Sequence, residues 1–141
     1  MKEPYTCIYD TAIRNMELIH NLNDEKEISI SRIELVPCRN TGESEITLNE
    51  LISRSKEGRF ASNERHARYL LSNQQKIPNA PKSNILFIET RWKSKDNLLW
   101  IPILEMLYFP QIKKKFWILS LMNLPDVMWV RHNNHRFAEI T

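Results

Sequence analysis

The spacing of hydrophobic residues changes near residue 78, and this change divides the chain into two parts. Before it, apolar residues recur at three- and four-residue steps between polar stretches, which is typical of amphipathic helices. After it, β-branched and aromatic residues form short runs separated by polar turns, which is typical of strands. The sequence therefore predicts one α+β domain over residues 1–141. Helices in the helix-rich part, 1–77, pack on one face of an antiparallel β-meander of about four or five strands in 84–141.

Three helices are expected in the first part. Apolar residues at three-residue steps predict a helix over 12–22. The segment 47–50, Thr-Leu-Asn-Glu, matches a capping box and predicts a helix that ends at Gly58, in the position of a C′ glycine. A third helix is expected from Ser62 or Asn63 to about Asn73. A short strand is also expected over 5–9. Apolar and polar residues alternate over 28–35, which predicts a second strand, and Pro37 stops it from continuing.

The second part predicts consecutive strands joined by short turns. Pro102 interrupts the run 98–109, which fits helical and extended spacing alike, and strand propensity favours a bent strand there. Asn133-Asn134 predicts a two-residue hairpin turn between the last two strands, because asparagine tolerates positive φ angles. The expected strands cover residues 85–92, 98–109, 116–122, 127–132 and 135–140.

Glycine and cysteine content excludes several classes of site. The chain of 141 residues has two glycines, Gly42 and Gly58, and they are too far apart for a P-loop or a dinucleotide-binding fingerprint. We expect no cofactor. The two cysteines, Cys7 and Cys38, are too few for a disulfide framework, and the chain has neither a CxxC nor an HExxH motif. We expect no metal site and two buried thiols in a reducing compartment.

The sequence predicts no targeting signal. The residues after Met1 are polar, so they do not predict a signal peptide. The longest apolar runs, 98–104 and 116–125, are shorter than the ~18–20 residues that cross a bilayer. The sequence therefore predicts a soluble, cytoplasmic protein without a transmembrane segment.

Positive charge is concentrated in the second half of the chain. Residues 1–70 hold 10 lysines and arginines against 12 acidic residues, a net charge of −2, whereas residues 71–141 hold 10 against 5, a net charge of +5. All four tryptophans lie in this basic half. Lysines 113–115 precede Phe116 and Trp117, and lysines beside aromatic rings suit single-stranded nucleic acid or an anionic membrane surface. Lysines that only keep a sheet edge soluble remain the alternative. The candidate binding residues are Lys113, Lys114, Lys115, Trp117, Arg65 and Arg68.

A second hypothesis comes from the histidines around the predicted Asn-Asn turn. His132 and His135 flank the turn, and Arg131 and Arg136 lie outside them. Two imidazoles supply a general base and a general acid near neutral pH, and guanidinium groups bind phosphate. This arrangement indicates a metal-independent ribonuclease, although the same residue types are common in solvated turns.

The leading hypothesis is a non-enzymatic module that binds a macromolecule through its basic, tryptophan-rich half. RNA or another single-stranded nucleic acid is the first partner to test, and exposed tryptophans on a sheet also suggest a homodimer. A third hypothesis is an inhibitor or immunity-type protein that binds an acidic protein partner. Few glycines and many isoleucines, asparagines and lysines are typical of accessory proteins from viruses, phages or mobile elements.

Overall fold

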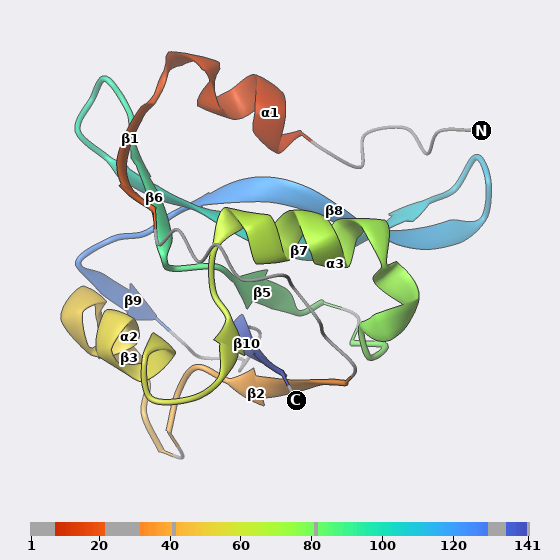
Figure 1. Cartoon of the computed structure of the whole chain (residues 1–141), viewed down its shortest axis with the longest axis horizontal. Coiled ribbons are helices and arrows are strands. Elements are labelled where there is room, and N and C mark those ends of the chain that lie inside the picture. The colour runs from red at the N-terminus through yellow and green to blue at the C-terminus, as the bar shows by residue number, and fades with distance from the viewer. Residues whose placement is uncertain (1–7, 22–31, 41, 81, 130–134, 141) are drawn as a thin grey trace.

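A computed structural model describes residues 8–21, 32–40, 42–80, 82–129 and 135–140, and most of its regular structure is β-strand (Figure 1). The elements follow along the chain as α1 (Tyr9–Ala12), η1 (Ile13–Asn15), β1 (Glu17–Asn21), β2 (Ile33–Pro37), β3 (Glu45–Thr47), α2 (Leu48–Ser55), β4 (Phe60–Ala61), α3 (Glu64–Ser72), η2 (Gln74–Lys76), β5 (Asn84–Leu86), β6 (Thr90–Lys93), β7 (Leu99–Phe109), β8 (Lys114–Asn123), β9 (Val127–Trp129) and β10 (His135–Ile140).

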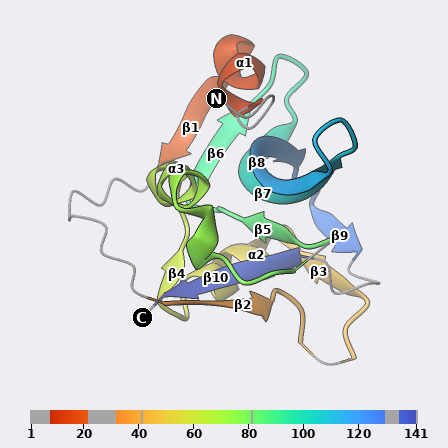
Figure 2. The ribbon, with the colours of Figure 1, turned by 90° about the vertical axis from the view of Figure 1, so that its right-hand side faces the viewer.

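The main sheet is mixed and curled. Its strands run in the order β1-β6-β7-β5-β10-β2, with β8 added beside β7 and β4 beside β10. β10 is parallel to β5, and the other pairs in this sheet are antiparallel. Strands β3 and β9 form a separate two-stranded sheet. Figure 2 shows the strong bend of the β7–β8 pair, which gives the main sheet the shape of half a barrel.

Hydrophobic cores lie on both faces of the main sheet. Alternate residues of the run 85–88 face opposite sides, so Ile85 and Phe87 enter one core while Leu86 and Ile88 enter the other. The first core is covered by α1 and α3, which contribute side chains that include Tyr9, Ala67 and Leu70. The second is covered by α2 and β3, which contribute Leu51 and Ile46. A strand with neighbours on both faces has to be apolar throughout, and this explains the unbroken run.

The predicted architecture, with N-terminal helices packed on a C-terminal meander, is wrong. Strands β1 and β2 come from the first part of the chain and join the same sheet as the later strands. Sequential hairpins connect only part of the sheet, β6 to β7 and β7 to β8. The remaining order depends on pairings between distant segments, which local spacing of apolar residues does not encode.

The helix predicted over 12–22 is also wrong. After the short helices α1 and η1 the chain extends as β1, with Leu18 44% and Ile19 48% exposed, so the three-residue spacing does not mark a buried helical face. Instead β1 pairs along β6. Asn21 Oδ1 also accepts a hydrogen bond from Thr90 Oγ1 at 2.7 Å. This tertiary pairing outweighs helix propensity. The strand predicted over 5–9 lies largely outside the described residues, and Tyr9 belongs to α1.

The other two predicted helices are confirmed, with one correction. Thr47 caps α2 and accepts a hydrogen bond from Glu50 N at 3.2 Å, and Asn63 caps α3 and accepts one from His66 N at 2.9 Å. Gly58 is not a C′ glycine, because it has no positive φ angle. A Cβ atom there would lie 2.7 Å from Cζ of Phe60, so glycine is needed for the close approach of this ring.

The bent strand around Pro102 is confirmed as β7. The carbonyl of Pro102 accepts a hydrogen bond from Phe87 N at 3.1 Å. This edge of β7 pairs with β6 through Leu99 and Trp100 and with β5 from Ile103 onward. Pro102 therefore lies between the two ladders. Proline has no backbone N–H to donate, and neither ladder requires one at this position.

The last two described strands do not form the predicted hairpin. β9 pairs with β3 in the small sheet, whereas β10 lies in the main sheet between β2 on one edge and β5 and β4 on the other. The expected turn at Asn133-Asn134 lies outside the described residues. Within the described part of the chain, no helix combines the length and the apolar character needed to cross a membrane.

Candidate functional site

A cleft with a volume of about 580 Å³ brings two of the four histidines of the chain beside a buried glutamate. We call it the His20 cleft. Its volume lies in the range of small-molecule sites, ~300–1,000 Å³. Its walls come from β1, the end of α2, β4, the start of α3 and β10, so the fold assembles it from distant parts of the chain. The residues that carry its chemistry are His20, Ser55, Lys56, Arg59, His66 and Glu89.

Glu89 anchors the cleft between β5 and β6. Glu89 is 3% exposed, and its backbone N–H donates to the carbonyl oxygen of Ser62 at 2.7 Å. Its Oε2 lies 2.9 Å from Nε2 of His20, and its Oε1 lies 3.3 Å from Ser55 Oγ. A buried carboxylate is tolerated only with such polar neighbours. Since the His20 side chain is 38% exposed, its contact with Glu89 connects the interior with the cleft.

His66 lies in the first turn of α3. Its ring Nδ1 accepts a hydrogen bond from the backbone N–H of Ser62 at 3.1 Å. An imidazole whose Nδ1 accepts carries its proton on Nε2. A second proton would break this hydrogen bond and would place positive charge at the positive end of the helix dipole. This hydrogen bond fixes the orientation of the His66 ring in the wall of the cleft.

The contact with Glu89 sets the orientation of the His20 ring. An ionised carboxylate only accepts hydrogen bonds, so Nε2 of His20 donates to Glu89, and Nδ1 is the ring atom that can take a proton from a ligand. A base backed by a carboxylate is an arrangement suited to general-base catalysis.

Two cationic residues line the same cleft. Lys56 and Arg59 follow α2, and both are exposed. The carbonyl of Arg59 accepts a hydrogen bond from Ile140 N at 2.7 Å, which ties this turn to β10. Cations at the mouth of a cleft raise the local concentration of anions, so an anionic ligand suits this cleft best.

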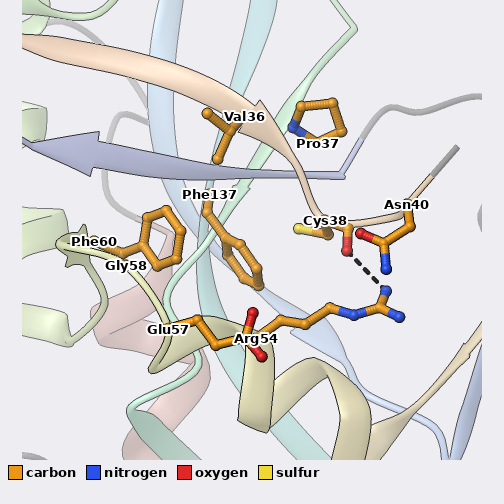
Figure 3. Close-up of a pocket in the computed structure, with 9 residues that line it drawn as sticks. All are labelled: Val36, Pro37, Cys38, Asn40, Arg54, Glu57, Gly58, Phe60 and Phe137. Atoms are coloured by element: carbon orange, nitrogen blue, oxygen red, sulfur yellow. Dashed lines mark hydrogen bonds between the residues drawn. The ribbon is translucent and has the colours of Figure 1, made fainter.

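A smaller pocket of about 220 Å³ (Figure 3) shares the lining residues Gly58 and Phe60 with the His20 cleft. Here Arg54 donates to the carbonyl of Cys38 at 3.2 Å and forms two hydrogen bonds with the Glu43 carboxylate, at 2.8 and 2.6 Å. Burial raises the pKa of the Cys38 thiol far above its usual range, so it is not a reactive nucleophile. These contacts hold the 38–43 loop against α2 and give this pocket a structural role.

The predicted lysine site lies at the tip of the β7–β8 hairpin, which projects from the body of the protein (Figure 1). We call residues 107–116 the lysine hairpin; it contains three lysines and no acidic residue. All three lysines are exposed. Lys115 lies across from Tyr108, which is 56% exposed, and Lys114 lies across from Phe109. Cross-strand partners share one face, so cationic and aromatic groups stand side by side.

The other predicted binding residues do not join this surface. Trp117 is 2% exposed and packs in the first core, so its ring cannot stack on a ligand. Arg68 Nη2 contacts Asp10 Oδ1 at 2.5 Å and Glu64 Oε1 at 2.8 Å, so two carboxylates balance its charge. Arg65 is exposed on α3, whereas the three lysines lie on the β7–β8 hairpin.

The four residues of the predicted ribonuclease hairpin are only partly described. His132 and Arg131 lie outside the described residues. His135 and Arg136 begin β10, where Arg136 pairs with Pro37 and Ile85 in the ladders. His135 is half-buried, and burial lowers the pKa of its ring. Because β9 and β10 belong to different sheets, the ladder that was expected to bring these side chains together is not formed by the described strands.

Sequence reasoning missed the His20 cleft because it placed residue 20 within the helix predicted over 12–22. One signal was available: Glu89 directly follows the apolar run 85–88, where a charged side chain has to be buried or partnered. Across the described ranges, no three histidine, cysteine or acidic side chains are placed to hold a metal ion. Comparisons with protein-family models, curated proteins and solved structures find no match to this chain.

Proposed function

We propose that this protein binds single-stranded nucleic acid, with RNA as the first ligand to test, through the lysine hairpin. The observation that carries the proposal is the exposed cross-strand pair of Tyr108 and Lys115 within a segment that has three lysines and no acidic residue. A base can stack on the tyrosine while the lysines neutralise the neighbouring phosphates. We assign to Tyr108 the stacking role that the sequence suggested for Trp117, because Tyr108 is an exposed aromatic residue of the lysine hairpin.

The electrostatic part of this proposal is tested by the salt dependence of binding. The triple variant Lys113→Gln, Lys114→Gln, Lys115→Gln is compared with wild type by the fluorescence anisotropy of a labelled oligouridine over a range of KCl concentrations. Each phosphate contact with a single strand contributes ~0.7 to the slope of log K against log salt, so the slope should fall in magnitude by about 2. A matched control replaces three exposed lysines elsewhere, Lys82, Lys93 and Lys95.

The outcomes separate the lysine hairpin from general charge attraction. A control variant that loses as much slope as the hairpin variant would contradict the proposal, because net charge alone would then explain binding. Failure of wild type to bind oligouridine while it binds vesicles of an anionic phospholipid would replace nucleic acid with a membrane surface.

The stacking part is tested at one residue. Tyr108→Ala should weaken binding at every salt concentration and leave the slope unchanged, because a stacked base contributes ~1–3 kcal/mol without releasing counterions. Leu98→Ala, at an exposed position outside the lysine hairpin, is the control and should leave the affinity unchanged. Equal affinities of wild type and Tyr108→Ala would exclude stacking on this ring.

A further inference from the structure

The His20 cleft contains chemistry that nucleic-acid binding by the lysine hairpin does not use. In Figure 1 the hairpin tip lies at one end of the molecule, and β1 and α2, which line the cleft, lie toward the other end. The cleft holds a buried carboxylate in contact with the imidazole of His20, and it also holds two cations. A contact that only stabilised the fold would not need the two cations.

The arrangement limits the reaction to one that needs a base and a cationic pocket. The hydroxyl of Ser55 donates to the carbonyl of Ile52 at 2.6 Å and lies 3.3 Å from Glu89, so its proton is directed away from either ring. It is therefore not arranged as the nucleophile of a serine–histidine pair. A base that acts without a protein nucleophile suits a substrate that carries its own hydroxyl group.

RNA is a substrate of this kind. It is anionic, as Lys56 and Arg59 favour, and each ribose carries a 2′-hydroxyl next to the phosphodiester that it can attack. The choice of RNA rests on the proposed function, whereas the acid–base geometry of the cleft does not.

We propose that the His20 cleft is a catalytic site that cleaves RNA by intramolecular transesterification. Nδ1 of His20 takes the proton of the 2′-hydroxyl, the 2′-oxygen attacks phosphorus, and the bond from phosphorus to the 5′-oxygen breaks. The leaving 5′-oxygen takes a proton from water, and the imidazolium of His20 returns its proton to solvent. The products are a 2′,3′-cyclic phosphate and a 5′-hydroxyl, so the step is balanced without any co-reactant.

The remaining groups have separate roles in this reaction. Lys56 and Arg59 stabilise the negative charge that grows on the phosphoryl oxygens. Glu89 does not touch the substrate; it is a positioning residue that orients the His20 ring and stabilises the imidazolium.

The test uses a substrate too short to need the lysine hairpin. Wild type is incubated with uridylyl-3′,5′-adenosine in EDTA, and the products are separated by chromatography. We expect a 2′,3′-cyclic product from the ribonucleotide and no reaction of the analogue that lacks the 2′-hydroxyl. Removal of a general base lowers the rate ~10²–10⁴-fold, so His20→Ala should lose that much activity, and added imidazole should restore part of it.

Matched variants distinguish a loss of catalysis from misfolding of the variant and from cleavage by a contaminating nuclease. Lys56→Ala and Arg59→Ala change exposed side chains of the cleft and should raise KM, whereas Lys95→Ala, exposed in the turn between β6 and β7, should leave kcat and KM unchanged. Absence of cleavage by wild type, or cleavage that His20→Ala does not reduce, would overturn the proposal. The triple lysine variant should still cleave the dinucleotide, so failure of the proposed function and failure of this inference give different results.

The positioning role of Glu89 is tested by the pH dependence of the cleavage rate, which a purely structural role would leave unchanged. Glu89→Gln keeps the shape of the side chain and removes its charge. It should move the acidic limb of the pH–rate profile to lower pH, because the imidazolium then lacks its carboxylate partner. A lower rate with an unchanged profile would contradict the positioning role.

Discussion

Burial at single positions decides which side chains of this protein are available for chemistry. Trp117 and Cys38 are each 2% exposed, whereas Tyr108 is 56% exposed. Residue type predicts the same behaviour for Trp117 and Tyr108, since both rings stack on bases. Position in the ladder separates them: Tyr108 lies across from Lys115 near the hairpin tip, whereas Trp117, two residues farther along β8, packs in the first core. Accessibility of a candidate residue therefore had to come from the fold.

His135 makes the stability of the protein depend on pH. Burial lowers the pKa of its ring below the ordinary 6.5, so below about pH 6.5 the unfolded chain binds a proton that the folded protein does not bind. The free energy of unfolding should fall as the pH falls through this value. One such proton contributes at most ~1.4 kcal/mol per pH unit, and less here because the ring is only half-buried.

The measurement is urea unfolding of wild type and His135→Gln at pH 7.5 and pH 5.5. Wild type should lose more stability between these pH values than the variant does. Parallel loss in both proteins would show that other groups carry the pH dependence, and a wild type that gains stability on acidification would contradict the direction of the pKa shift.

At the scale of elements, the sequence predicted the helices whose first backbone N–H groups donate to a nearby side chain. The capping residues Thr47 and Asn63 predicted the starts of α2 and α3, because a side-chain oxygen that accepts from the first helical turn is encoded within four residues. The spacing over 12–22 failed for the converse reason, because β1 forms its hydrogen bonds with β6, some 70 residues away in the chain. Strands at sheet edges depend on partners that no local window contains.

The two helix caps should differ in their contribution to stability. Asn63 is 2% exposed, so Asn63→Ala leaves a buried backbone N–H without its acceptor and should cost about 1–2 kcal/mol. Thr47 is exposed, and water can replace its hydroxyl. Thr47→Ala should therefore cost less, ~0.5–1 kcal/mol. Urea unfolding of both variants measures the difference, and a larger loss for Thr47→Ala would contradict this ranking.

At the scale of the whole molecule, composition predicted a mixture of helices and strands but not their arrangement. The His20 cleft shows the consequence most directly. His20, His66 and Glu89 come from three segments of the chain, and the contact between His20 and Glu89 spans 69 residues. The pairing of β1 with β6 brings these two residues together. Without the strand order, the sequence offered no reason to prefer them to His132 and His135.

The strands of the main sheet should differ in local stability. Both edges of β10 are paired, by β2 on one side and by β5 and β4 on the other. Among the described strands β1 pairs only with β6, and it exposes Leu18 and Ile19. Backbone amides of β10 should exchange with deuterium only on near-global unfolding, and those of β1 much faster. Hydrogen exchange followed by mass spectrometry measures both. Exchange of β10 as fast as that of β1 would contradict the central place of β10.

The position of β10 in the sheet also governs when the protein can fold during its synthesis. Its partner Ile33 precedes Ile140 by about 100 residues, so β2 emerges from the ribosome long before the strand that completes its ladder. Until residues 135–140 are made, β2, β4 and β5 each lack this neighbour, and unpaired strand edges favour aggregation. Nascent chains of this protein should therefore be most prone to aggregate before residues 135–140 have been made.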